Sequence, residues 1–351
     1  MCQGDGVIEP MVSAHATSAE SVRELLAADV GGTHARLALV RAEPANGLPV
    51  QLLSSHTYIC ADWSSLDEIL ADFVARHAAG SAIRRAVVAT PGYIHGDVIV
   101  NQNLPWPVSI SALRQGLMLE QLEIINDFEA LAYVTPFLAR RDSVAIIEST
   151  GMHATAINPA GAVVVVGPGT GLGCAVLLPG GRSRRVLSTE AGHIVLAPGT
   201  ERELAVVARM ANGRSYVPTG HALSGPGLLN IYRALAELDH QPVRCHTPAQ
   251  VSTAAVAASD PLAVESLQIF CGLLGSLVGD LAILFSATGG VYLAGGILSR
   301  FQEFLLDSSF RERFFNKGVM RDLLEQVPVR LLQHGQLGVV GAAVWLTHGW
   351  Q

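Results

Sequence analysis

Two segments of this 351-residue chain share one pattern, in which an apolar run meets a glycine-rich turn and a second apolar run follows. The first segment, residues 25–40, contains the turn Asp29-Val-Gly-Gly-Thr33, and the second, residues 162–178, contains Gly167-Pro-Gly-Thr-Gly-Leu-Gly173. Neither turn is followed by apolar residues at helical spacing. Each segment is therefore predicted to form strand, tight turn and strand. The recurrence predicts two related halves, although no sequence repeat of fixed period accompanies it.

Four other stretches have apolar residues three and four positions apart, which predicts amphipathic helices. They are residues 66–77, 201–211, 228–238 and 262–285. Strands mixed with helices predict an α/β chain with layered sheets, and the length indicates about two domains. The most apolar window, residues 269–285, is shorter than a membrane span requires and is predicted to be a buried helix. The polar segment 135–142 is the expected crossing between the two halves.

The composition excludes several classes of protein. Lysine and arginine number 23 against 30 acidic residues, a net charge of −7, which argues against a broad basic face for nucleic acid or anionic lipid. The only lysine is Lys317, in no recognisable motif. Phosphate loops of the Gly-Lys-Ser/Thr type, pyridoxal enzymes and protein kinases all depend on a lysine that this sequence does not supply.

The five cysteines are widely spread and form no CxxC pair, which favours a reducing, cytoplasmic location over a disulfide framework or zinc site. Residues 1–22 lack the cationic start and apolar stretch of a secretion signal. We expect them to form a disordered tail.

Glycine turns at strand ends allow backbone N–H groups to approach a phosphate, because no Cβ blocks the ligand. A plain hairpin turn is the alternative for either turn alone. A dinucleotide fingerprint does not fit the second turn, since G-x-G-x-x-G frames begun at Gly167 or Gly169 meet Leu172 or Cys174. Such a fingerprint would also open a helix, whereas a strand is predicted here.

Two acidic residues follow predicted strands. Asp29 could hold a magnesium ion through water, or could cap an acidic turn. Asp127 follows residues 122–125 and Asn126, where a general base would stand, and its structural alternative is a helix N-cap.

Glu190 and His193 could together bind a polyhydroxyl ligand, although a lone histidine is more often structural. No third metal ligand lies near this pair in the sequence. The chain also has no G-x-S-x-G motif, which disfavours a serine hydrolase.

Six motifs, in this order, resemble those of the bacterial glucokinase family. They are Asp29-Val-Gly-Gly-Thr33, Ile124-Ile-Asn-Asp127-Phe, Gly167-Pro-Gly-Thr-Gly-Leu-Gly173, Glu190-Ala-Gly-His193, Leu223-Ser-Gly-Pro-Gly-Leu-Leu-Asn-Ile-Tyr232 and Gly289-Gly-Val-Tyr-Leu-Ala-Gly-Gly296. The resemblance covers about residues 25–346 and implies a two-domain actin-like ATPase (ribonuclease H-like) fold with the active site in the interdomain cleft. It divides the chain into a small α/β domain, 23–137 plus 334–351, and a large α/β domain, 138–333.

The resemblance also implies the site and its ligands. Asp127 would be the catalytic base for the sugar 6-hydroxyl, while Asn126, Glu190 and His193 would bind other hydroxyls. The nucleotide would be bound by Asp29, Gly31, Gly32, Thr33, Gly169, Thr170, Gly171, Gly295 and Gly296, with Asp29 holding Mg²⁺ through water. The implied ligands are glucose, ATP and Mg²⁺, without nucleic acid or membrane, and a homodimer is allowed because members of the family are often dimers.

Three positions depart from the family pattern. Gly220 stands where the family has a sugar-binding glutamate, His34 replaces an asparagine, and Ala191 replaces a glycine. The gap at Gly220 leaves two alternatives to a glucokinase: a sugar- or nucleotide-binding sensor with little activity, and a kinase for another hexose. A dehydrogenase is the weakest rival.

Overall fold

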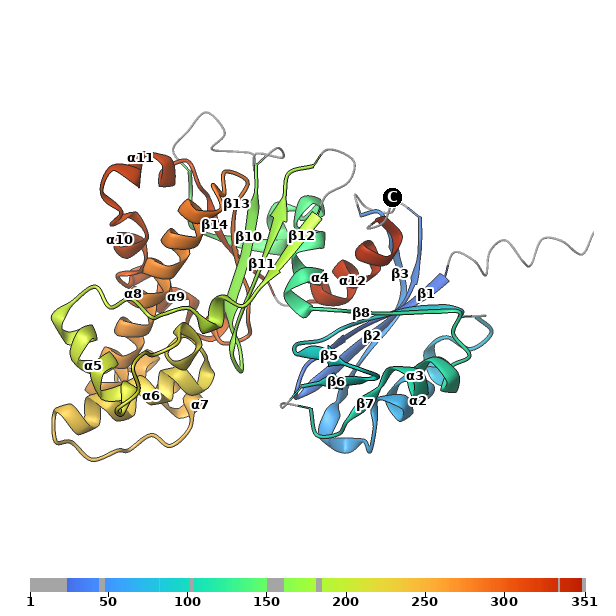
Figure 1. Cartoon of the computed structure of the whole chain (residues 1–351), viewed down its shortest axis with the longest axis horizontal. Helices are drawn as coiled ribbons and strands as arrows, with labels where there is room; N and C mark the ends of the chain where they lie inside the picture. The colour runs from blue at the N-terminus through green and yellow to red at the C-terminus, as the bar shows by residue number, and fades with distance from the viewer. Residues whose placement is uncertain are drawn as a thin grey trace, which may run out of the picture.

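The computed structural model describes residues 24–43, 48–81, 83–101, 104–149, 161–180, 185–333 and 335–348. The predicted tail, residues 1–22, lies outside these ranges. Two large sheets dominate the structure, each with its own helices, and two helices lie between them (Figure 1). We call the parts built on these sheets the N-terminal lobe and the C-terminal lobe.

The N-terminal lobe contains a five-stranded sheet of order β3-β2-β1-β4-β8. Strands β1, β2 and β3 are antiparallel neighbours, whereas β1, β4 and β8 run parallel. The bounds are β1 Glu24–Val30, β2 His34–Arg41, β3 Gln51–Ile59, β4 Arg85–Ala89 and β8 Gln121–Ile125. A small sheet of β5 (Tyr93–His95), β6 (Val98–Val100) and β7 (Val108–Ser109) adjoins it, with helices α2 (Leu66–His77) and α3 (Ile110–Gly116).

The C-terminal lobe contains a six-stranded sheet of order β12-β11-β10-β13-β14-β9. Its first five strands repeat the order and directions of the N-terminal sheet, and the edge strand β9 is added antiparallel to β14. The bounds are β9 Ser143–Ile147, β10 Val163–Pro168, β11 Leu172–Leu178, β12 Arg185–Thr189, β13 Gly290–Leu293 and β14 Val329–Leu332. This repeated topology confirms the prediction of two related halves and of an actin-like ATPase fold.

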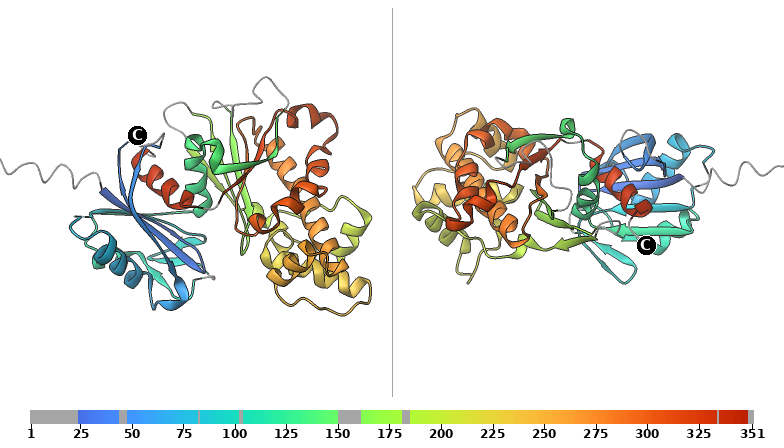
Figure 2. Two further views of the ribbon diagram at one scale, coloured as in Figure 1. Left: turned by 180° about the vertical axis from the view of Figure 1, so that it is seen from behind. Right: turned by 90° about the horizontal axis from the view of Figure 1, so that it is seen from above.

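Helices α4 (Asp127–Val134) and α12 (Leu337–His348) pack against each other between the two sheets (Figures 1 and 2). Alternate residues of β1 serve the two faces of its sheet: Leu25 and Ala27 pack towards α4 and α12, while Leu26 and Ala28 join the core under α2 and α3. Because both faces are covered, the strand reads as a continuous apolar run. Packing of α4 on both sheets ties residues at its start to both lobes.

The outer face of the second sheet is covered by helices. They are α5 Glu201–Ala211, α6 Gly225–Leu238, α7 Pro248–Val256, α8 Pro261–Leu284, α9 Gln302–Asp307, α10 Phe310–Phe315 and α11 Arg321–Leu324. Helices α6 and α8 begin earlier than predicted, because Ser224 and Asp260 cap them and a proline occupies the first turn of each.

Helix α8 contains the apolar window that the sequence predicts to be buried. Among the described residues it is the one helix long and apolar enough to cross a membrane, and 72% of its most apolar window is buried inside the protein. Its neighbours are α6, α7 and α10. The helix therefore serves as the core of the C-terminal lobe.

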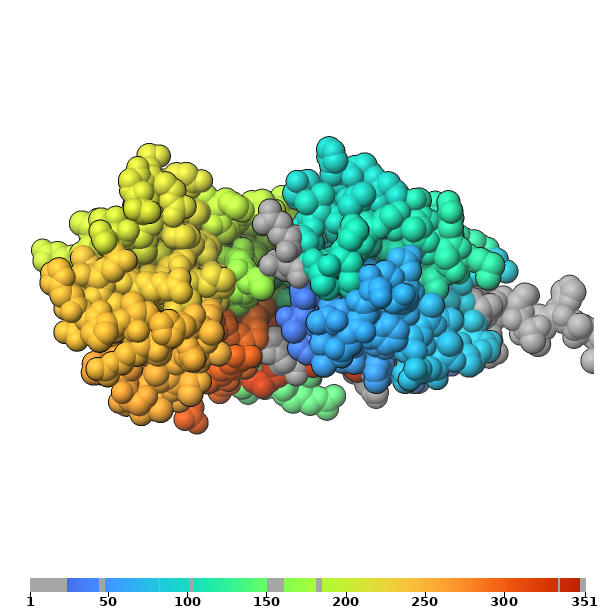
Figure 3. All heavy atoms as spheres, turned by 90° about the horizontal axis from the view of Figure 1, so that it is seen from below, coloured from blue at the N-terminus to red at the C-terminus, as the bar shows by residue number. Residues whose placement is uncertain are grey.

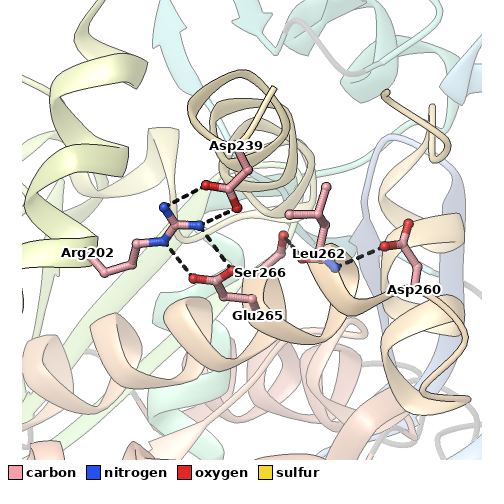
Figure 4. Close-up of polar contacts among 6 residues, drawn as sticks. All are labelled: Arg202, Asp239, Asp260, Leu262, Glu265 and Ser266. Carbon is pink, nitrogen blue, oxygen red and sulfur yellow. Dashed lines mark hydrogen bonds and ion pairs between the residues drawn. The ribbon is translucent and has the colours of Figure 1, made fainter. Parts of the chain in front are cut away.

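One arginine joins three helices of this lobe (Figure 4). Arg202 of α5 donates to Asp239 Oδ1 and Oδ2 at 2.9 and 2.6 Å and to Glu265 Oε1 at 2.7 Å. Asp239 ends α6, and the hydrogen bonds from Arg202 lower its carboxyl pKa. The far end of α6 is thereby fixed to α5 and α8, and the opposite end of α6 reaches the site described below.

The five strand and four helix segments predicted above all occur, with small shifts at their ends. The bounds 23–137 plus 334–351 and 138–333 stay a prediction. The lobes that we describe rest on the two sheets alone.

Candidate functional site

A cavity of about 810 Å³ lies between the lobes, and the molecule is hollowed there when seen from below (Figure 3). Its walls are mostly loops that follow the carboxyl ends of strands in both sheets, where ligands bind in open α/β sheets. Pro218, Gly220 and His221, which precede α6, complete the lining. Seven predicted site residues line it: Asn126, Asp127, Gly169, Thr170, Gly171, Glu190 and His193. Predicted site residues that are far apart in the sequence therefore meet in one cavity.

The start of α4 presents Asp127 to this cavity. Asn126 is the N-cap, and its Oδ1 accepts the N–H groups of Phe128 at 2.8 Å and Glu129 at 3.3 Å. The alternative interpretation of Asp127 as the N-cap is therefore wrong by one residue. Asp127 is the first helical residue, and its Oδ1 accepts the Phe128 N–H at 3.0 Å. Capping by Asn126 leaves the Asp127 carboxylate available to a ligand.

The pKa of Asp127 is raised to about 7. Burial is the main cause, the negative charge of Asp29 is the second, and the hydrogen bond from Phe128 N–H opposes both. A carboxyl group with a pKa near neutrality, facing a cavity, is suited to accept a proton at physiological pH.

Asp29 is the last residue but one of β1, outside the lining of the cavity but near enough to Asp127 to raise its pKa. Across the hairpin, Arg36 Nη1 lies 3.5 Å from Asp29 Oδ2. A Cβ added to Gly338, in the first turn of α12, would lie 2.6 Å from the same oxygen. The Asp29 carboxylate therefore lies between Arg36 and the start of α12. The sequence did not predict that α12 approaches Asp29.

The carboxylates near the cavity fit a magnesium ion that would be bound partly by the protein and partly by substrate phosphates and water. No group of three histidine, cysteine, aspartate or glutamate side chains clusters anywhere in the described ranges. Magnesium commonly binds one or two carboxylates together with substrate phosphates and water. Asp29 supplies such a carboxylate.

The first glycine turn follows β1, and Gly31 N–H donates to His34 O at 3.0 Å to close it. Gly31, Gly32 and Thr33 do not line the cavity. They stand beside Asp29 at the carboxyl end of the sheet.

The second glycine turn enters the cavity. Gly169 N–H donates to Gly171 O at 2.7 Å, and Gly169 O accepts the N–H of Gly225, the first residue of α6, at 2.8 Å. A Cβ on Gly173 would lie 2.0 Å from the Phe128 ring, so glycine at this position lets α4 pack against the turn. The end of the second turn therefore contacts Phe128, the residue after Asp127.

Gly295 and Gly296 lie at the end of β13, next to the second turn but outside the cavity lining. Gly295 has φ of +98°, and a Cβ there would lie 2.2 Å from Pro168 O. Only glycine permits this backbone conformation and this close approach.

Glu190 and His193 flank a short 3₁₀ turn on the C-terminal lobe. His193 Nε2 lies 3.9 Å from Glu190 Oε2, and their side chains are 76% and 87% exposed. Both line the cavity and can reach a ligand.

Gly220 also lines the cavity, beside this turn. Its backbone is fixed because Thr219 Oγ1 donates to Ala191 O at 2.5 Å and Ser224 Oγ donates to Gly220 O at 2.7 Å. A Cβ at Gly220 would lie 3.2 Å from Gly192 O. Position 220 is therefore closely packed against the turn, and the cavity wall has no carboxylate there.

Several lining residues were not predicted, among them Tyr93 and His221. Tyr93 follows Thr90-Pro-Gly92 at the end of β4, a third strand-end turn that could have indicated it. Burial and the charge of Arg214 lower the pKa of His221, and Arg214 Nη2 lies 3.4 Å from its Nε2. His221 adjoins Gly220 directly, so a sequence signal existed.

Comparison with known proteins gives one consistent result. The glucokinase family model matches residues 26–349. A "Glucokinase-like protein" of Xylella fastidiosa (strain 9a5c) is 46% identical over 328 residues, which are 93% of this chain and 96% of that protein. A "Glucokinase" of Yersinia pestis (strain Pestoides F) is 37% identical over 321 residues, 92% of this chain and 95% of that protein.

Solved structures agree. The crystal structure of a glucokinase from an Antarctic psychrotroph is 35% identical, with a TM-score of 0.80, covering 92% of this chain and 98% of that one. A ROK family glucokinase from Streptomyces griseus, in complex with glucose and AMPPNP, shares the fold with 20% identity and a TM-score of 0.60, covering 91% and 98% of the two chains. The chain is a sugar kinase in fold and sequence, and it belongs to the glucokinase family.

Proposed function

We propose that this protein transfers the γ-phosphoryl group of ATP to the 6-hydroxyl of glucose, with Asp127 as the general base. The observation that carries the proposal is the position of Asp127. Its carboxyl group, with a pKa of about 7, lines the same cavity as the second glycine turn of the opposite lobe. The family, and relatives named as glucokinases, support glucose and ATP as the substrates.

In the proposed reaction the Asp127 carboxylate accepts the proton of the sugar hydroxyl. The hydroxyl oxygen forms a bond to the γ-phosphorus, and the bond from that phosphorus to the β–γ bridging oxygen breaks. ADP leaves with the electron pair. Such a transfer depends mainly on positioning and charge stabilisation, which backbone donors can provide without a lysine.

The sugar would be oriented by Asn126, Glu190 and His193, which share the cavity with Asp127. Glu190 and His193 have exposed polar atoms that can bind hydroxyl groups. Asn126 uses Oδ1 to cap α4, so its side-chain amide N–H groups are the atoms it can offer a sugar.

The nucleotide would be bound by both glycine turns and by Gly295 and Gly296. Gly169, Thr170 and Gly171 line the cavity and are placed to approach the γ-phosphate, while Gly31, Gly32 and Thr33 lie beside Asp29. Asp29 would hold Mg²⁺ through water. The ion would neutralise phosphate charge when bound.

The glycine at position 220, which lines the cavity, motivates a second candidate. Without a carboxylate there, glucose loses a binding group, and hydrogen bonds to charged groups contribute about 1.5–3 kcal/mol each. A kinase for another hexose, or a sensor with weak turnover, is consistent with the lack of this carboxylate and with relatives named "Glucokinase-like protein".

Location and assembly complete the proposal. We place the protein in the cytoplasm, and the four described cysteines, all free thiols, fit a reducing compartment. A homodimer is part of the same proposal, and light scattering of the purified protein would test it.

One experiment separates the candidates. The purified protein is assayed with MgATP and a panel of hexoses in a coupled ADP assay, alongside isothermal titration of each sugar. Turnover greatest with glucose supports the glucokinase, and greater turnover with another hexose supports the second kinase. Sugar binding without turnover would identify the sensor and contradict the proposed function.

A further inference from the structure

The first glycine turn is fastened to the core of the N-terminal lobe by one residue. Cys60 Sγ donates to Gly31 O at 3.4 Å, and Cys60 N–H donates to Thr33 O at 2.9 Å. Cys60 follows β3 and is fully buried with Tyr58 and Leu66. Two carbonyl groups of the turn are therefore directed into the core.

Fixing a carbonyl also fixes the next N–H group. In a trans peptide the N–H points opposite to the carbonyl of the same peptide unit, and the described chain has no cis peptide bonds. With the Gly31 carbonyl held inward, the Gly32 N–H is directed outward, away from the core. Outward N–H groups of this kind form anion-binding concavities.

The second turn uses the same arrangement with a different donor. Gly169 O accepts the backbone N–H of Gly225, which directs the Thr170 N–H the opposite way, and Thr170 lines the cavity. In each lobe, a carbonyl group of the glycine turn therefore accepts a hydrogen bond from another residue of the same lobe. The donor in the C-terminal lobe is backbone, whereas the donor to Gly31 is a side chain that mutation can remove.

We propose that Cys60 is a positioning residue, which directs the Gly32 N–H toward the phosphates of the bound nucleotide. The proposal rests on the proposed function, because it assumes that the first turn binds nucleotide. Burial raises the pKa of the Cys60 thiol, so the group remains protonated and able to donate at neutral pH.

Three variants distinguish positioning from packing. Cys60→Ser keeps a donor at nearly the same place, Cys60→Val fills the space without a donor, and Cys60→Ala removes both. We expect Cys60→Ser to keep KM for MgATP and Kd for Mg-AMPPNP within about twofold of the unmodified protein. Cys60→Val and Cys60→Ala should raise both about three- to tenfold, with KM for the sugar unchanged.

Cys271 provides a matched control, because it is equally buried but lies in α8 of the C-terminal lobe. Cys271→Ala should lower the melting temperature and leave KM for MgATP unchanged. Normal nucleotide affinity in Cys60→Val, together with weakened affinity in Cys60→Ser, would show a packing role and overturn the proposal. If the unmodified protein fails to bind Mg-AMPPNP, the proposed function is wrong, and this role falls with it.

Discussion

The carboxylate of Asp29 lies close enough to Asp127 to raise its pKa, although the two residues belong to different strand ends of the N-terminal sheet. The pairing of β1 with β4 and of β4 with β8 brings these ends together. The Asp29 carboxyl group lies 3.5 Å from Arg36 Nη1, whereas Asp127 lines the cavity. This difference in environment supports the different roles that we propose for them, proton exchange for Asp127 and charge stabilisation for Asp29.

The first prediction concerns pH. A general base acts when unprotonated, so kcat/KM for the sugar should fall as the pH drops below about 7. Asp29→Asn removes a negative charge that raises the pKa of Asp127, so the falling limb should move to lower pH, whatever happens to the maximum rate. Asp307→Asn, at the exposed end of α9, serves as the control. If the falling limb of the pH profile in Asp29→Asn stays at the pH of the unmodified protein, the charge coupling between Asp29 and Asp127 is contradicted.

The second prediction concerns stability. Folded Asp127 retains its proton up to about pH 7, whereas the unfolded chain releases it near pH 3.8. Between these values the folded state holds the extra proton, so the free energy of unfolding due to Asp127 falls as the pH rises. Asp127→Asn stays neutral and should stabilise the ligand-free protein at pH 8 by about 1–3 kcal/mol, and less at pH 5. Urea denaturation at both pH values measures this, and equal or lower stability at pH 8 would refute it.

The third prediction concerns the start of α12. A methyl group on Gly338 would press on Asp29 Oδ2, at 2.6 Å, and displace the carboxylate. We expect Gly338→Ala to raise KM for MgATP about tenfold, with a smaller change in KM for the sugar. Gly335→Ala is the matched control, because no atom lies within 4 Å of its added Cβ. Equal kinetics in the two variants would show that α12 does not position Asp29.

The fourth prediction concerns Gly220. Gly220→Glu introduces a carboxylate into the wall of the cavity, with its Cβ 3.2 Å from Gly192 O, a contact that a small shift relieves. If the lack of a carboxylate at this position limits glucose binding, KM for glucose should fall about tenfold. Gly220→Gln, similar in size but uncharged, should recover less. A KM for glucose that does not fall in Gly220→Glu would show that the lack of a carboxylate at this position does not limit glucose binding.

Several central strands and the long helices were predictable because their residues carry a clear pattern, whereas the central strands β4 and β14 were not predicted. Strands β1 and β10 are buried on both faces, so their apolar runs stand out. The edge strands β3, β9 and β12 were not predicted, since partial exposure leaves them without such a run. Their presence is decided by pairing with β2, β14 and β11, which no local sequence pattern reveals.

The site was predictable in part for the same reason. Asp127 and the second glycine turn each follow a strand that was predicted from its apolar run. Strand ends at one edge of a sheet are a common place for ligands. The contact of Gly338 with Asp29 and the position of His221 depend on long-range packing. The charge coupling of Asp29 to Asp127 depends on strand order, which the sequence does not display.

The central claim is that Asp127 takes the proton from the sugar hydroxyl, and the turnover of Asp127→Asn tests it most directly. With MgATP and glucose, kcat should fall by about 10²–10⁴-fold, because the amide cannot accept the proton. Glucose affinity by isothermal titration should stay within about threefold, since the other hydroxyl-binding groups remain. A kcat near that of the unmodified protein would contradict the account.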